Sequence, residues 1–504
     1  MSRGNPLQAQ VRNVLRACEG KPPYLLMHMR TTHAGNMYRG GFFYGRDVIL
    51  CGIRIMPGLI VPSACIKYKI IGEAMAMERT YIKNLQAGQA CRIQGFVENI
   101  RNTRAMMFLV IRDCTGKVQV TIEKMAHPEM ADLLEHLTVE SVVTVDGVAQ
   151  LNPAVKLGGI EVLPSGLCTE SLAAPLPLLK DSSVDVRMDY RWLSLRGERE
   201  QLLFRVQTLL LESMRRFLLK QDFMEIHTPK LIAMASESGS EVFEVKYFDG
   251  KAYLAQSPQF YKQMAMAAGF ERVFEVGPVF RAEKSFTNRH STEFTGFDLE
   301  FSYITSFVDV MRLEEALLRD ALRNVKEAYG KDIERLYGIE VTVPSLPFPV
   351  IALHDLYDEL ERRYGYAVPE SEKGDTTTEA EQLAYRYVKE VYGHEFLFVT
   401  DFSSEKRAFY HMRKNGVPQG YDLNWRGVEI TTGAQREHRY ELLLKQAEEK
   451  GLGEDVKFYT EFFRYGCPPH GGFGLGLDRL TMLLLNTTIK EAMFLFRGPN
   501  RITP

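Results

Sequence analysis

The sequence predicts an α+β protein in which a small β-barrel precedes a larger domain of antiparallel strands and helices. Three observations support this prediction. Short strands of alternating polar and apolar residues crowd residues 79–176. A helical repeat of apolar residues covers residues 198–220. Farther along the chain, a strand–loop–strand pattern at residues 279–299 and a second one around Arg426 and Gly427 indicate hairpins.

Length and composition set broad limits on the class of protein. The chain has 504 residues, enough for two to four domains, and its net charge is only −2. Any contact with nucleic acid must therefore use local basic patches. The seven cysteines form no CxxC pair, so we expect reduced thiols, without a zinc site or disulfides. No apolar run approaches the roughly 18 residues that span a membrane, and we expect a cytoplasmic protein without membrane contact.

Residues 1–76 differ from the rest of the chain. They contain three acidic residues beside ten Lys or Arg and have no clear periodicity. One interpretation is an organellar presequence, which is typically basic and poor in acids. The other is that translation begins at Met75 or Met77. We assign this extension no function.

Residues 77–176 are predicted to form the first domain. Five strands with a helix before the fourth are typical of an OB-fold barrel, which often binds single-stranded nucleic acid on exposed aromatic rings. A lone Phe on a strand, such as Phe108, is more simply a core residue. Residues 177–197 are expected to be a linker. The strands are expected near residues 90–97, 107–112, 118–122, 141–147 and 159–163, and the helix near 128–137.

Residues 198–504 are predicted to form the second domain, which opens with a long helix. Its apolar residues recur at three- and four-residue spacing, as in Leu203, Val206 and Leu210. Further leucines widen this stripe beyond one core face, which favours a dimer interface. Burial within one subunit is the alternative.

The hairpin at residues 279–300 concentrates charge in its loop. Its loop and the adjoining strand ends combine arginines, a carboxylate and an aromatic ring. Arginine binds phosphate, a carboxylate accepts from an amino group, and an aromatic ring stacks on a base, so these side chains together suit ATP. The alternative is an ordinary charged surface hairpin. The side chains in question are Arg281, Glu283, Lys284, Arg289, His290 and Phe294.

Two further stretches carry chemistry. Asp422 and Glu429 would lie on neighbouring strands if Arg426 and Gly427 make the turn, and two carboxylates facing one point suit Mg²⁺. Two exposed acids are the alternative. Near the C-terminus, the alternating glycines of residues 471–479 allow a backbone to approach a ligand closely.

An upstream strand that ends at Pro229 and two of these stretches resemble, in chain order, motifs 1, 2 and 3 of the class II aminoacyl-tRNA synthetases. They are residues 223–229, 281–294 and 471–479. The resemblance spans about residues 77–504 and is closest to the aspartyl-tRNA synthetases of the archaeal and eukaryotic type. The segment 305–400 is too short for the inserted domain of the bacterial enzymes. Asp478 stands where these families usually have Glu.

The resemblance implies an OB-fold anticodon-binding domain, and a catalytic domain built on an antiparallel sheet flanked by helices, in a homodimer. It implies the Mg²⁺-dependent attachment of L-aspartate to tRNA(Asp), and in some members also to tRNA(Asn). The reaction runs through aspartyl-adenylate and turns ATP into AMP and pyrophosphate. Charging of tRNA(Asn) would require a tRNA-dependent amidotransferase as a partner. The alternatives are an asparaginyl-tRNA synthetase and a paralogue that charges no tRNA.

The resemblance also assigns residues. Lys262 and Arg436 would present two cations to the aspartate side chain, whereas an amide would leave a buried charge unpaired. The implied catalytic residues are Arg281 and Arg479. The implied ATP site comprises Arg281, Glu283, Arg289, His290, Phe294, Glu429, Gly476 and Arg479, and the implied metal ligands are Asp422 and Glu429. The implied aspartate site comprises Glu237, Gln259, Lys262, Asp298, Thr432 and Arg436, and the implied anticodon contacts are Arg101, Phe108 and Gln119.

Overall fold

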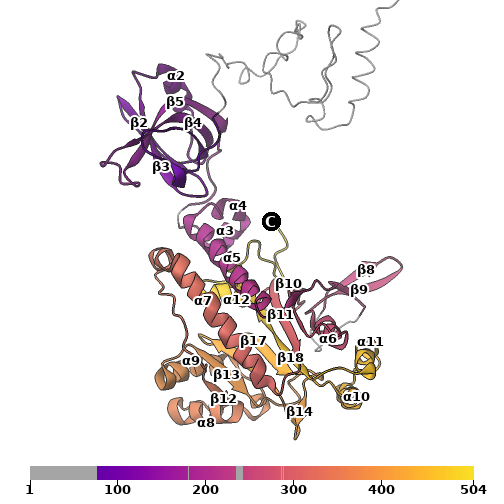
Figure 1. The fold of residues 1–504 in the computed structure, drawn as a ribbon. Coiled ribbons are helices and arrows are strands. Elements are labelled where there is room, and N and C mark those ends of the chain that lie inside the picture. The colour runs from indigo at the N-terminus through magenta and orange to yellow at the C-terminus, as the bar shows by residue number, and fades with distance from the viewer. Residues whose placement is uncertain (1–76, 180, 234–241, 285–286, 288) are drawn as a thin grey trace, which may run out of the picture. The chain divides into compact units, whose positions relative to one another are not determined.

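The computed structural model describes residues 77–179, 181–233, 242–284, 287 and 289–504 (Figure 1). These residues fall into two compact units, the first of which is made of barrel segments. In the described part of the chain, no helix is long and apolar enough to cross a membrane.

The N-terminal domain is a closed five-stranded barrel with the strand order β1-β2-β3-β5-β4. Alternate residues point inward, so Met107, Leu109 and Ile111 are buried while their neighbours are half-buried. This arrangement confirms the OB-fold prediction, although the first and last strands extend farther than expected. The elements are η4 (Ile82–Asn84), β1 (Ala90–Asn102), β2 (Met106–Arg112), β3 (Lys117–Glu123), α2 (Pro128–Glu135), β4 (Val142–Leu151) and β5 (Ile160–Ser171).

The segment predicted as a linker contains two short helices, α3 (Val184–Asp189) and α4 (Arg191–Ser194). Arg191 is buried, and its Nη2 donates to the carbonyl oxygens of Glu491 and Met493 at 2.8 and 2.9 Å. These carbonyls lie at the end of α13 (Ile489–Ala492), where a cation is favourable. The helices are therefore fixed to the C-terminal part of the chain.

The C-terminal domain is built on an eight-stranded sheet with the order β12-β13-β16-β17-β18-β11-β10-β6. Its six central strands pair antiparallel, as predicted, and the short edge strands β6 and β12 pair parallel. The strands are β6 (Met224–Glu225), β10 (Arg272–Phe280), β11 (Glu293–Ser302), β12 (Val350–Ala352), β13 (Phe396–Thr400), β16 (Gly420–Trp425), β17 (Val428–Gln435) and β18 (His470–Gly476). Smaller sheets join β7 (Leu231–Ile232), β8 (Glu244–Tyr247) and β9 (Gly250–Leu254), and β14 (Arg413–Lys414) with β15 (Val417–Pro418).

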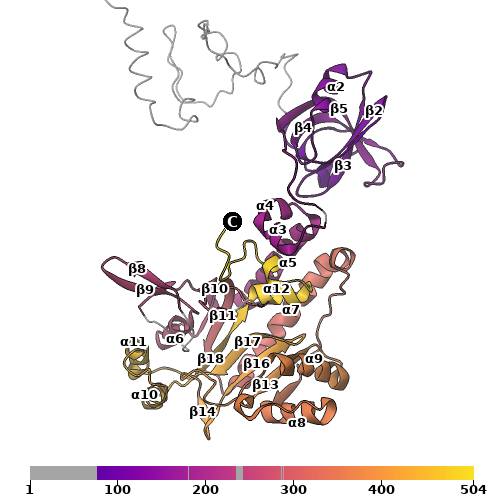
Figure 2. The ribbon, with the colours of Figure 1, turned by 180° about the vertical axis from the view of Figure 1, so that it is seen from behind.

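Helices flank this sheet (Figures 1 and 2). The long helices α5 (Glu198–Leu219) and α7 (Phe307–Tyr337) pack together over one face and share the largest apolar core with the central strands. A capping box of Ser306 and Asp309 begins α7. The other elements are α6 (Gln259–Ala267), α8 (Leu353–Tyr364), η5 (Glu370–Glu372), α9 (Thr378–Tyr392), α10 (Tyr440–Glu449), α11 (Lys457–Thr460), η6 (Glu461–Tyr465) and α12 (Leu477–Leu484).

Candidate active site

A cavity of about 230 Å³ lies against the central strands of the large sheet. It collects side chains from the β10–β11 hairpin, α6, β17, β18 and the start of α12. Twelve of the residues implied by the resemblance line it: Gln259, Arg281, Glu283, Arg289, His290, Phe294, Asp298, Glu429, Thr432, Arg436, Gly476 and Arg479. Lys262 and Asp422 do not line it, and Glu237 lies outside the described residues.

The glycines of β18 let three strands come together at the cavity. Gly474 stands opposite both Asp298 on β11 and Thr432 on β17. A Cβ atom added at Gly474 would lie 2.9 Å from Oδ1 of Asp298. At Gly472 it would lie 2.0 Å from the carbonyl oxygen of Leu299. A larger residue at Gly474 would therefore displace Asp298 at the cavity, and one at Gly472 would collide with the backbone of β11.

One end of the cavity combines cations with an aromatic ring. The guanidinium of Arg281 lies 5.5 Å from the ring centroid of Phe294 and 3.9 Å from the carboxylate of Glu283. Arg479 is fixed to the backbone of β17, since its Nη1 donates to the carbonyl oxygen of Glu429 at 2.7 Å. Both arginines keep donors near the cavity, as a bound polyanion requires.

His290 at this end is a weaker cation than its sequence suggests. Burial lowers the pKa of its imidazole, and the positive charges of Arg479 and Arg289 lower it further. The ring is therefore neutral near pH 7 and offers hydrogen bonding instead of charge.

Arg289 pairs with a helix that the sequence left without a function. Its Nη1 forms an ion pair with Glu381, and its Nη2 donates to Oγ1 of Thr378 at 2.8 Å. Both partners lie in the first turn of α9. Sequence reasoning missed Glu381 because nothing in the spacing of the segment 305–400 links it to the hairpin.

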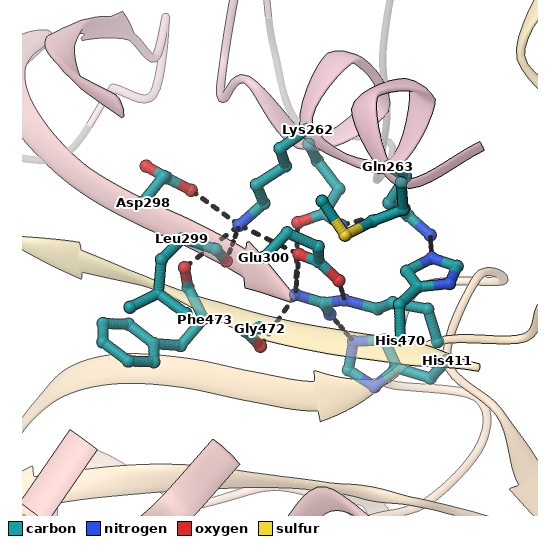
Figure 3. A network of polar contacts seen from close by, with 12 residues as sticks. Lys262, Gln263, Asp298, Leu299, Glu300, His411, His470, Gly472 and Phe473 are labelled. Atoms are coloured by element: carbon teal, nitrogen blue, oxygen red, sulfur yellow. Dashed lines mark hydrogen bonds and ion pairs between the residues drawn. The ribbon is translucent and has the colours of Figure 1, made fainter. Parts of the chain in front are cut away.

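The other end of the cavity overlies a buried ionic network (Figure 3). Lys262 on α6 is 2% exposed, and its Nζ donates to Asp298 Oδ1 at 3.0 Å, the Phe473 carbonyl at 3.0 Å and the Leu299 carbonyl at 3.3 Å. An ammonium has three donors, so these acceptors use all of them. Lys262 thus lies behind Asp298, which does reach the cavity.

Arg436 lies beside this lysine and shares a carboxylate with it. Its Nε donates to Glu300 Oε1 at 3.0 Å, and its Nη2 donates to the Gly472 carbonyl at 2.9 Å. The other Glu300 oxygen lies 3.5 Å from Nζ of Lys262. Two buried cations thus face two carboxylates, Asp298 and Glu300. Of the two cations expected to face the substrate side chain, Arg436 lines the cavity and Lys262 does not.

Glu300 is a residue that sequence reasoning missed. It is fully buried on β11, two residues after Asp298, and a strand places such residues on the same face. This spacing was a usable signal. The neighbouring positive charges of Arg436 and Lys262 hold the pKa of Glu300 below its ordinary value despite its burial.

The predicted acid pair is brought together, but the two carboxylates differ. Arg426 and Gly427 do make the turn, with φ of 51° and 77°, and Asp422 stands opposite Thr432. The Glu429 carboxylate lies at the cavity, 2.9 Å from the Thr432 hydroxyl that donates to it. Asp422 is buried, and both of its oxygens accept from Arg407, at 2.8 and 2.5 Å.

These residues partly fit a magnesium ion. Glu429 and the Thr432 hydroxyl offer oxygen ligands at the cavity, which suits Mg²⁺ with phosphate oxygens completing its shell. Burial raises the pKa of Asp422 to about 6, and the nearby charge of Glu429 adds to this. The described residues contain no group of three or more Asp, Glu, His or Cys that could hold a metal by themselves.

The predicted anticodon residues lie on neighbouring strands of the barrel. Phe108 is half-buried on β2, and the guanidinium of Arg101 lies 4.1 Å from its ring centroid. On β3, Nε2 of Gln119 donates to Oγ1 of Thr121 at 3.0 Å and approaches Glu161 at 3.3 Å. Phe108 is therefore not a core residue.

Comparison with known families agrees with this architecture. Residues 183–497 match the class II tRNA synthetases (D, K and N), and residues 91–165 match an OB-fold nucleic acid binding domain. The chain belongs to the class II tRNA synthetases.

Individual relatives narrow the comparison. The chain is 40% identical over 451 residues to an aspartate--tRNA(Asp/Asn) ligase of Aeropyrum pernix, covering 87% of this chain and all of the relative. It is 40% identical to an aspartate--tRNA(Asp) ligase of Pyrococcus abyssi, covering 83% and 97%. Among solved structures, it resembles the asparaginyl-tRNA synthetase of Pyrococcus horikoshii complexed with asparaginyl-adenylate, with TM-score 0.78, 31% identity and coverage of 85% and 100%. It likewise resembles an aspartyl-tRNA synthetase of Entamoeba histolytica, with TM-score 0.76, 30% identity and coverage of 85% and 93%.

Proposed function

We propose that this protein attaches L-aspartate to tRNA(Asp), using ATP and forming aspartyl-adenylate. The observation that carries the proposal is one cavity with two different ends. One end gathers Arg281, Arg479 and Glu429, and the other has Arg436 and Asp298 over a buried ionic network. The names of the archaeal relatives favour the same substrate.

In the first step, the α-carboxylate of aspartate attacks the α-phosphorus of ATP and pyrophosphate leaves. Such a step requires positioning and charge neutralisation, and no nucleophile from the protein. Arg281 would hold the attacking carboxylate beside the α-phosphate, and Phe294 would stack on the adenine. Arg479, already fixed by the Glu429 carbonyl, would bind the terminal phosphate.

The amino acid end would select the substrate by hydrogen bonds and charge. Asp298 would accept from the α-ammonium of the substrate, with Gln259 beside it. Arg436 would donate from Nη1, whose protein contact is Nε2 of His411 at 3.4 Å, to the side-chain carboxylate. Lys262 would act through Asp298, because it lies behind that residue. The role of Glu237 stays a prediction.

Magnesium would be held by Glu429 and Thr432, and Asp422 would take part if Arg407 released one of its oxygens. The ion supplies charge neutralisation for the β- and γ-phosphates when bound. The protein residues fix where these phosphates lie.

In the second step, a hydroxyl of the terminal tRNA ribose attacks the carbonyl carbon of the adenylate, and AMP leaves. The barrel would hold the anticodon by stacking on Phe108 and by a base contact of Gln119, with Arg101 on phosphate. These three residues lie on the adjacent strands β1, β2 and β3.

We also propose a cytoplasmic homodimer. The support is apolar surface on α5 and β6, where Leu219 is 55% and Met224 53% exposed. Analytical ultracentrifugation of wild-type protein and of Leu219→Asp tests this idea. A monomeric wild type would contradict it.

The decisive experiment is aminoacylation of tRNA(Asp) and tRNA(Asn) transcripts with aspartate, with asparagine as the control. Aspartate on tRNA(Asp) alone would indicate a discriminating enzyme. Aspartate on both would indicate one that depends on an amidotransferase partner. Asparagine in place of aspartate would support the asparaginyl alternative, to which a solved relative lends weight. No charging at all would favour a non-charging paralogue.

A further inference from the structure

The guanidinium of Arg289 is held from behind by the first turn of α9. Glu381 pairs with Nη1, and Oγ1 of Thr378 accepts from Nη2 at 2.8 Å. Arg289 lines the cavity, whereas neither of these two partners does. The contact therefore acts on the cavity only through the arginine.

The first turn of α9 is capped and packed against the rest of the domain. The Thr377 side chain caps the helix by accepting from the Ala380 backbone at 3.0 Å, and the Glu381 backbone donates to the Thr377 carbonyl at 2.9 Å. Ala380, Ala384 and Val388 anchor the helix in an apolar cluster. The Glu381 carboxylate is thus presented by a fixed backbone and is nearly buried.

The residue after Glu381 ties α9 to the turn between β16 and β17. Nε2 of Gln382 donates to the carbonyl oxygen of Gly427 at 2.7 Å, in the turn between β16 and β17. Strand β17 carries Glu429, which together with Arg289 and Arg479 lies close enough to act electrostatically on Glu381. The start of α9 therefore bridges the Arg289 loop and the strand pair with the candidate metal ligand.

We propose that Glu381 is a positioning residue for the nucleotide, which fixes Arg289 so that its remaining donors meet the ATP phosphates. This inference rests on the proposed function, because it requires ATP in this cavity. An arginine fixed before binding loses less side-chain freedom when the ligand arrives.

A competing contact predicts the opposite effect, because a carboxylate paired with Arg289 would compete with the phosphates for it. The two cases differ in sign. A positioning contact makes ATP binding weaker when Glu381 is neutralised, and a competing contact makes it tighter.

The test compares Glu381→Gln with Glu379→Gln, an identical change on an exposed residue of the same helical turn. Titration calorimetry measures MgATP binding without aspartate, and ATP–pyrophosphate exchange measures the two KM values. We expect Glu381→Gln to weaken ATP binding about fivefold to twentyfold and to leave the KM for aspartate within about twofold. Glu379→Gln should change neither value.

Two further variants separate positioning from folding. Thr378→Val removes one acceptor of Arg289 at an exposed site and should weaken ATP binding about twofold to fivefold. The double variant Arg289→Gln/Glu381→Gln should bind ATP no more weakly than Arg289→Gln alone, because the carboxylate acts through the arginine.

The inference is wrong if Glu381→Gln melts at the same temperature as the wild type and binds ATP equally tightly or more tightly. If Glu381→Gln does not fold, Thr378→Val and its ATP affinity decide the question. If the wild type binds MgATP but neither aspartate nor asparagine stimulates ATP–pyrophosphate exchange, the proposed function is wrong instead. The calorimetric comparison still tests Glu381 in that case.

Discussion

Nζ of Lys262 lies 3.0 Å from Oδ1 of Asp298, and the lysine is behind the cavity wall while the aspartate is part of it. Together with Glu300 and Arg436, this pair forms a cluster whose charges balance. A zwitterionic substrate with an extra carboxylate must therefore be recognised by geometry as well as by charge.

Replacing Lys262 by Met should destabilise the protein strongly. Asp298 and Glu300 would lose one buried partner each, and breaking a buried ion pair costs roughly 3–5 kcal/mol. Urea denaturation followed by circular dichroism measures this loss. Lys251→Met is the control, because Lys251 is exposed and paired with Glu244, and it should cost less than about 1 kcal/mol. Equal losses would show that the network contributes nothing special.

Replacing Arg436 by Lys should damage aspartate binding while sparing ATP. The charge stays, but one ammonium cannot reach both Glu300 and the Gly472 carbonyl as the planar fork does. We expect the KM for aspartate in ATP–pyrophosphate exchange to rise about 10- to 100-fold, with the KM for ATP within about threefold. Arg439→Lys, on a more exposed arginine paired with Glu437, should leave both values unchanged. A parallel rise in both KM values would argue for general unfolding of the site.

Much of the fold was predictable because its signals are local. Alternation along each barrel strand and the glycine at the Arg426–Gly427 turn depend only on neighbouring residues. The two edge strands β6 and β12 have only two and three residues, too few to show a period. The helices α3 and α4 were missed for the same reason.

The residues of the candidate site were predictable where a sequence motif contains them. Their ion-pair partners were not predictable where those partners come from distant parts of the chain. Arg281, Glu429 and Arg479 reach the cavity as expected. The pairing of Asp422 with Arg407 depends on a loop without periodicity, and that of Arg289 with Glu381 joins segments far apart in sequence. Such ion pairs leave no trace in residue spacing.

His470 should make the protein less stable as the pH falls below neutrality. Burial lowers the pKa of this imidazole to about 4, from 6.5. Between pH 6.5 and 4 the unfolded chain binds a proton at this histidine and the folded chain does not. The free energy of unfolding therefore falls by about 3 kcal/mol as the pH falls from 6.5 toward 4. His470→Gln should lose this dependence, and His354→Gln, on an exposed histidine, should keep it. Urea denaturation at pH 4.5, 5.5 and 6.5 measures the free energy of unfolding of the wild type and both variants. If this free energy depends on pH equally in all three proteins, His470 is not a buried neutral ring.

Glu314 should produce the opposite dependence on pH. Its buried carboxyl group lies beneath the sheet on α7, where burial raises the pKa to about 8 although Tyr421 donates to it at 2.6 Å. The folded protein therefore keeps a proton that the unfolded chain releases above pH 4.5, and stability falls as the pH rises from 4.5 to 8.

Glu314→Gln removes this titration with little change in shape, and glutamine can still accept from Tyr421. The variant should match the wild type near pH 4.5 and exceed its free energy of unfolding by roughly 3–5 kcal/mol at pH 8. Glu327→Gln, on the exposed side of the same helix, should follow the wild type throughout. Denaturation curves at pH 5 and pH 8 measure the difference. A variant less stable than the wild type at pH 8 would mean that Glu314 is ionised in the folded protein and that its charge stabilises the sheet.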